Sequence, residues 1–136
     1  MAGSPSLHSS HPTTDTQLVA TVAAAVEKKQ KMKDVVSNTR DYNQGLLIDK
    51  ETMTMVADSG IELCKQLDVI AAQGLALKHA SYWQGLSLGG GLSTSAHGSS
   101  FFGKRAAVHE LVLGMRLVMP ASHEEGFAKV LNLTDS

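Results

Sequence analysis

The sequence predicts a mainly α-helical fold in which three to four helices form a bundle or a helical hairpin. Apolar residues recur at spacings of three and four over long stretches, which is the period of an amphipathic helix. An alanine-rich stretch with high helix propensity opens the first of them. A glycine-rich segment between the second and third long stretches is typical of a connection between helices. The 136 residues are enough for one domain with its own core.

The first part of the chain predicts a disordered tail followed by a helix. Residues 1–14 are rich in Ser, Pro, Thr and His, so we expect them to be disordered, ahead of a single helical domain over 15–136. Asp15 or Thr16 is expected to cap a helix that runs to about Arg40. Its apolar stripe has heptad spacing with one lysine in it, and comprises Leu18, Val22, Ala25, Lys29, Met32 and Val36.

The next stretch permits two interpretations. Residues 52–56, Thr-Met-Thr-Met-Val, alternate as a strand does. The longer spacing of three and four favours a helix over 52–82, and Ser59 with Glu62 has the spacing of a capping box at which this helix would restart. Whether 52–56 is strand or helix stays open at this stage. The apolar stripe of this helix is a candidate interface with a partner, formed by Met53, Val56, Gly60, Leu63, Leu67, Ile70, Gly74 and Leu77.

Six glycines lie between Trp83 and Arg105. Ordering glycine is costly, so a glycine run beside aromatic residues indicates either a flexible connector or a backbone that binds something. We expect residues 86–103 to be a connector loop that becomes ordered on assembly. The aromatic residues at its two ends, Trp83, Phe101 and Phe102, extend the candidate interface.

The stretch from Gly98 to Arg105 resembles the phosphate-binding P-loop, whose pattern is G-x-x-x-x-G-K-[ST]. Backbone N–H groups at a helix start, together with a lysine, would hold an anion, so the candidate anion contacts are Gly103, Lys104 and Arg105. Arg105 stands where a P-loop has the hydroxyl residue that binds magnesium. We therefore expect no nucleotide hydrolysis, and a small anion- or phosphate-binding module is the alternative function.

Beyond this loop, residues 104–119 are predicted to form a third helix, which Pro120 ends. Its apolar residues occupy two faces, so Leu113 and Leu117 complete the candidate interface. The run LVLGMRLVM is alternatively a buried strand, because periodicity does not decide for short apolar runs. A second capping box, Ser122 with Glu125, predicts a short last helix.

Few residues stand in patterns that carry chemistry. The single cysteine, Cys64, excludes an intramolecular disulfide and a Cys-based zinc site. Each His-Glu pair is adjacent in sequence, so its two side chains point to different faces of a helix, and the HExxH spacing is absent. No G-x-S-x-G pattern is present. We therefore predict no cofactor, no metal and no enzymatic activity.

These observations predict a non-enzymatic helical assembly subunit, of the kind found in a coat, a filament or a secretion apparatus. Its partners would be proteins, in a homo-oligomer or a multi-subunit complex. The net charge of -1 does not indicate a nucleic-acid partner. The sequence shows no secretory signal and no apolar run long enough to span a membrane. We expect a location in the cytoplasm or in an assembled particle, with leaderless export also open.

Overall fold

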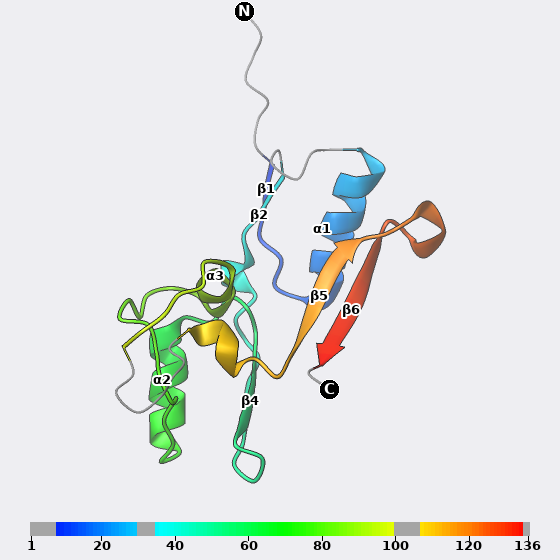
Figure 1. Ribbon diagram of the computed structural model, residues 1–136. Helices are drawn as coiled ribbons and strands as arrows, with labels where there is room; N and C mark the ends of the chain where they lie inside the picture. Colours follow the sequence, from blue (N-terminus) through cyan, green and yellow to red (C-terminus); the bar gives the residue numbers. More distant parts are fainter. Residues whose placement is uncertain (1–7, 30–34, 100–106, 135–136) are drawn as a thin grey trace, which may run out of the picture. The chain divides into compact units, whose positions relative to one another are not determined.

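The computed structural model describes residues 8–29, 35–99 and 107–134 (Figure 1). These residues form three α-helices, and six strands that pair into three two-stranded sheets. The fold is therefore mixed α/β, and the expected mainly helical bundle is wrong. The chain divides into two compact units. The first combines Met1–Asp41 with Leu113–Ser136, and the second is Tyr42–Val112.

Helix α1 of the first unit spans Asp15–Glu27, so it begins one residue before the earliest start that a cap at Asp15 or Thr16 predicts. Thr14 is its N-cap, and its side-chain oxygen accepts a hydrogen bond from the N–H of Gln17 at 3.3 Å. The helix ends well before the expected Arg40. Lys29 has a φ of 51°, in the left-handed region, where a helix does not continue.

Two strands flank α1 in sequence and pair in parallel. β1 (His8–Ser10) lies beside β2 (Val35–Ser37), with His8 opposite Val35. Parallel strands need a crossover connection, and α1 supplies it. β1 falls inside the stretch 1–14 for which the sequence predicts disorder. A single 3₁₀ turn, η2 (Thr39–Asp41), follows β2.

The last part of the first unit is a β-hairpin. β5 (Gly114–Pro120) pairs antiparallel with β6 (Ala128–Thr134). The predicted third helix is therefore wrong over this stretch, and the strand alternative is right, although the strand is largely exposed. The physical reason is the residue order, since Met115, Leu117 and Met119 alternate with their neighbours at period two.

The connection between β5 and β6 contains the predicted capping box. The N–H of Ser122 donates to Oε2 of Glu125 at 3.3 Å. The box opens only one 3₁₀ turn, η4 (His123–Glu125), because Gly126 follows with a φ of 76°. The expected last helix is thus replaced by β6.

The second unit begins with a hairpin of β3 (Leu46–Asp49) and β4 (Thr54–Ala57). A continuous helix over 52–82 is therefore wrong, and the strand interpretation of 52–56 is correct from Thr54 onward. The Asp49 carboxylate accepts hydrogen bonds from the N–H groups of Glu51 and Thr52, at 2.9 and 3.3 Å. Met53 then adopts a φ of 54°, which closes the turn.

Helix α2 (Leu63–Ala72) supplies much of the core of the second unit. Leu63 and Ile70 are buried beside Ile61, and buried Gln66 donates from Nε2 to the carbonyl oxygen of Ile61 at 3.2 Å. Glu62 is the N-cap without a side-chain hydrogen bond, so the predicted capping box at its start is absent. Gly74 has a φ of 75° and ends the helix. Gly74 therefore ends the helix and does not continue an apolar stripe along it.

The glycine-rich segment contains a short helix, α3 (Leu88–Ser93), where the sequence predicts only a connector. Ser87 caps it by accepting the N–H of Gly90 at 3.2 Å. A 3₁₀ turn, η3 (Val108–Leu111), closes the second unit. None of the helices in the described part of the chain is long and apolar enough to cross a bilayer.

Candidate functional site

Three stretches that are distant in sequence meet in the second unit, and they make it the best candidate for a site. Nε2 of His79 lies 2.9 Å from the carbonyl oxygen of Ala107. His97 forms an antiparallel bridge with Ala107, and the backbone of Gly98 packs on Ala80. We call His79, Ala80, His97, Gly98 and Ala107 the glycine-loop junction.

Gly98 is the most constrained position of this junction. A Cβ atom there would stand 1.8 Å from the carbonyl oxygen of Ala80, far inside van der Waals contact. Only glycine permits this approach of two backbones. The junction therefore brings two main chains together in a way that the sequence pattern alone did not reveal.

His79 is buried, and its two ring nitrogens have different surroundings. A carbonyl oxygen only accepts hydrogen bonds, so Nε2 carries the proton and donates to Ala107. Nδ1 is buried and has no hydrogen-bond partner among the residues that the structure describes. Ala107 is also held from its other side, because its N–H donates to Oε2 of Glu110 at 3.0 Å. The position of residue 107 thus depends on one histidine and one carboxylate.

The first turn of α3 has the appearance of an anion site, but its donors are already engaged. Each of its four N–H groups donates to an acceptor of this protein, at 2.7 to 3.2 Å. The acceptors lie on Ser59, Ile61 and Ser87. The glycines of this turn serve close packing, since a Cβ at Gly91 would lie 2.8 Å from Cδ1 of Leu86. An anion would bind here only at the cost of these hydrogen bonds.

A second polar cluster of this unit surrounds Asp58. Its Oδ2 accepts the N–H of Gly45 at 2.6 Å, and a Cβ at Gly45 would lie 2.9 Å from Oδ1. Burial raises the pKa of Tyr42, and the negative charge of Asp58 and a hydrogen bond to it raise that pKa further. These contacts fix the entry to β3. No motif in the sequence indicates this pair, because its members are sixteen positions apart and join through the fold.

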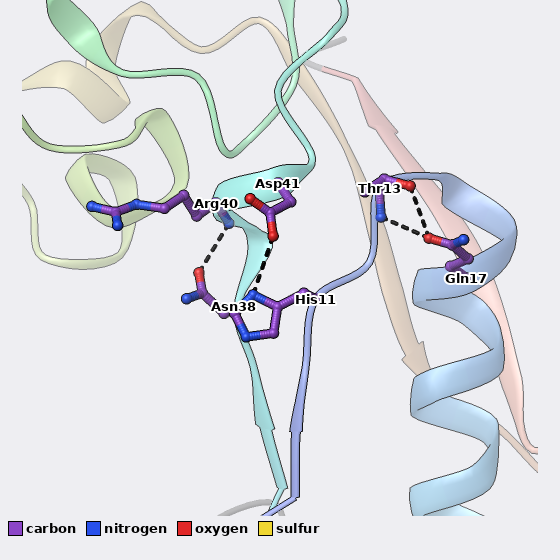
Figure 2. A network of polar contacts seen from close by, with 6 residues as sticks. All are labelled: His11, Thr13, Gln17, Asn38, Arg40 and Asp41. Atoms are coloured by element: carbon purple, nitrogen blue, oxygen red, sulfur yellow. Dashed lines mark hydrogen bonds and ion pairs between the residues drawn. The ribbon is translucent and has the colours of Figure 1, made fainter.

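Figure 2 shows a polar network in the first unit, at the end of β2. Nδ1 of His11 lies 3.2 Å from Oδ2 of Asp41, and Asn38 Oδ1 accepts the N–H of Arg40 at 3.0 Å. His11 and Asp41 are both about half exposed, so the pair contributes little to stability. Within the described ranges, no group of three His, Cys, Asp or Glu side chains is placed to hold a metal ion.

The structure distributes the candidate interface residues over several elements. Leu63, Ile70 and Gly60 are buried, Leu67 and Leu77 are half-buried, and Gly74 is an exposed helix terminator. The exposed apolar members are Met53, Val56, Trp83, Leu113 and Leu117. The candidate interface residues therefore do not lie on one helix face. Their contact with a partner stays a prediction. The remaining interface residues, Phe101 and Phe102, and the candidate anion contacts, Gly103, Lys104 and Arg105, lie outside the described residues.

No protein-family model matches the chain. Curated proteins do match it. The chain is 40% identical to L-gulonolactone oxidase 2 of Arabidopsis thaliana over 93% of its own length. It is 37% identical to L-gulonolactone oxidase 5 over 93%, and 35% identical to L-gulonolactone oxidase 3 over 92%, both from the same plant.

The chain spans about a quarter of the length of the curated relatives that it matches. The six curated relatives, which are 34–40% identical to the chain, are all named L-gulonolactone oxidase or probable L-gulonolactone oxidase. The expectation of a non-enzymatic structural subunit is therefore wrong, and so is its alternative, a small anion-binding module. The name of these relatives is that of an oxidoreductase.

Proposed function

We propose that this chain is part of an oxidase that acts on a sugar-derived lactone, as the names of its relatives state for L-gulonolactone. The observation that carries this proposal is an identity of 35–40% to several such oxidases over nearly the whole chain. The two units described above would then be one portion of a larger catalytic protein.

Oxidation of an alcohol carbon removes two electrons and two protons. In oxidases a redox cofactor accepts these electrons. The first turn of α3 does not fit a phosphate group of such a cofactor, because its four donors are engaged.

The contribution of the described residues is the rigid junction of the second unit. The contact between Gly98 and Ala80 and the hydrogen bond from His79 fix three separate stretches of backbone. Rigid supports of this kind hold cofactor and substrate in productive geometry, and small displacements lower the rate strongly. We therefore assign the glycine-loop junction a supporting role in the oxidase.

The test is a chimera in which this chain replaces the matching quarter of L-gulonolactone oxidase 2. We expect the purified chimera to oxidise L-gulonolactone, measured as dioxygen consumption or as reduction of an artificial electron acceptor. The Gly98→Ala chimera should lose most of this activity, whereas the matched Gly85→Ala chimera should keep it. A chimera that folds and oxidises neither L-gulonolactone nor related aldonolactones contradicts the proposal.

A further inference from the structure

The β5–β6 hairpin has an apolar face that no other described element of the first unit covers. Side chains alternate along each strand, and the register places Leu117 opposite Leu131 and Met115 opposite Leu133. These four residues and Met119 therefore share one face, which we call the open face. Each of the five side chains is 37–43% exposed.

Helix α1 covers the other face of the hairpin (Figure 1). Arg116 lies on that face and forms an ion pair with Asp15 at the start of α1. Ala128 on the same face is buried, and Val118 is half-buried. Val130, although 42% exposed, also lies on this side. The alternation thus directs one set of side chains to α1, and no described element of the first unit packs on the open face.

The chemistry of the open face matches a protein interior. Lys129, opposite Met119, is its one charged residue in the described hairpin, and its ammonium donates to Oε1 of Glu125 at 2.7 Å. Five neighbouring aliphatic and thioether side chains form a contiguous patch, which differs from singly scattered surface residues. Each strand also pairs with only one other described strand, and an isolated two-stranded sheet is marginally stable.

We propose that the open face packs against polypeptide that corresponds to the other three quarters of the L-gulonolactone oxidases. This inference rests on the proposed function. The matched relatives are about four times as long as the region they share with this chain, so they hold this region within a larger molecule. A second copy of the chain is a weaker occupant, because five partly exposed side chains supply well under the ~800 Å² per partner of a standard interface.

The experiment compares the same substitutions in the free chain and in the chimera with L-gulonolactone oxidase 2. Leu117→Lys and Leu131→Lys place a charge on the open face. Leu47→Lys is the matched control, since Leu47 lies on β3 in the second unit and is 72% exposed. Thermal unfolding and light scattering after size exclusion are recorded for every variant, together with lactone oxidation by the chimeras.

In the free chain we expect each open-face lysine to change the Tm by less than about 2 °C, because the parent side chains are partly solvated. In the chimera the same lysines should lower the Tm by about 5 °C or more, since a charge is then buried at a packed surface. Leu47→Lys should have the same small effect in both proteins. Equal effects of the open-face lysines in both contexts would overturn the inference, and so would a chimera that does not fold.

Two further outcomes separate this inference from the proposed function. A folded chimera with the context-dependent loss of stability but no oxidation supports the open-face contact and contradicts the oxidase proposal. An active chimera that tolerates both lysines supports the oxidase and overturns the contact. A free chain that dimerises, with dimerisation abolished by Leu117→Lys, assigns the face to a second copy and also overturns it.

Discussion

Gly98 lies with its backbone directly on Ala80, so closely that a Cβ atom at position 98 would come within 1.8 Å of the Ala80 carbonyl oxygen. Ala80 follows His79, which holds the carbonyl group of Ala107. One missing methyl group therefore allows three stretches of the second unit to meet. This explains why a glycine is required at this point of the segment.

Gly98→Ala should destabilise the second unit by about 1–3 kcal/mol, because the added methyl group displaces backbone rather than a flexible side chain. Urea unfolding followed by circular dichroism measures the change. Gly85→Ala is the control, since its Cβ would lie 3.4 Å from Nε1 of Trp83, an ordinary contact. We expect that variant to remain within about 0.5 kcal/mol of the parent. Equal stability of the two variants would show that the approach of Gly98 to Ala80 is not maintained in solution.

His79→Phe should also destabilise the second unit, by about 1–3 kcal/mol, because the carbonyl group of Ala107 loses its donor. Phenylalanine keeps a planar ring but is larger than histidine, so the loss reports both the missing hydrogen bond and some overpacking at this buried position. His97→Phe serves as the control, since His97 is exposed. Denaturant unfolding of the three proteins under identical conditions gives the comparison. A His79→Phe protein as stable as the His97→Phe protein would argue against the hydrogen bond.

Removal of Lys129 should change the acid titration of Glu125. The hydrogen bond from Lys129 lowers the pKa of Glu125 below its ordinary value of 4.5, and the N–H of Ser122 lowers it further. Because the pKa is lower in the folded than in the unfolded state, the carboxylate stabilises the fold above about pH 4.5. This contribution is lost as the pH falls through the folded-state pKa.

Carboxyl NMR titration measures the effect. In Lys129→Met the pKa of Glu125 should rise toward 4.5, and high salt should shift the parent protein in the same direction. The pKa of Asp49 is the internal control, because its hydrogen bonds to Thr52 and Glu51 lower it without any lysine. An unchanged Glu125 pKa in Lys129→Met would exclude the lysine as the cause.

Some signals that depend on neighbours in sequence were predicted well, although the capping box of Ser59 with Glu62 was not. The start of α1 at Asp15 and the capping box of Ser122 with Glu125 both rest on hydrogen bonds across three residues. The alternation over 52–56 also indicated the strand that begins at Thr54, although the longer spacing of three and four over 52–82 favoured a helix. The helix pattern failed because the turn at Met53 and the terminator at Gly74 divide it into unrelated elements.

Features formed by distant residues could not be predicted. The contact of Gly98 with Ala80 and the bond from His79 to Ala107 join positions that no local spacing relates. The similarity to oxidases leaves no local sequence pattern for a chemical reason. When a cofactor supplies the redox step, an oxidase needs no Ser-His or HExxH spacing, so the absence of such patterns does not indicate a structural subunit.

The first unit is assembled from both ends of the chain, and the second unit lies between these ends in sequence. During synthesis, α1 leaves the ribosome long before β5 and β6 are made, so the helix has no hairpin to pack against at that time. The second unit is contiguous in sequence, so it can fold before β5 and β6 are available to pack against α1. Translation order therefore makes the first unit the later of the two to form, and it leaves α1 exposed to chaperones in the interval.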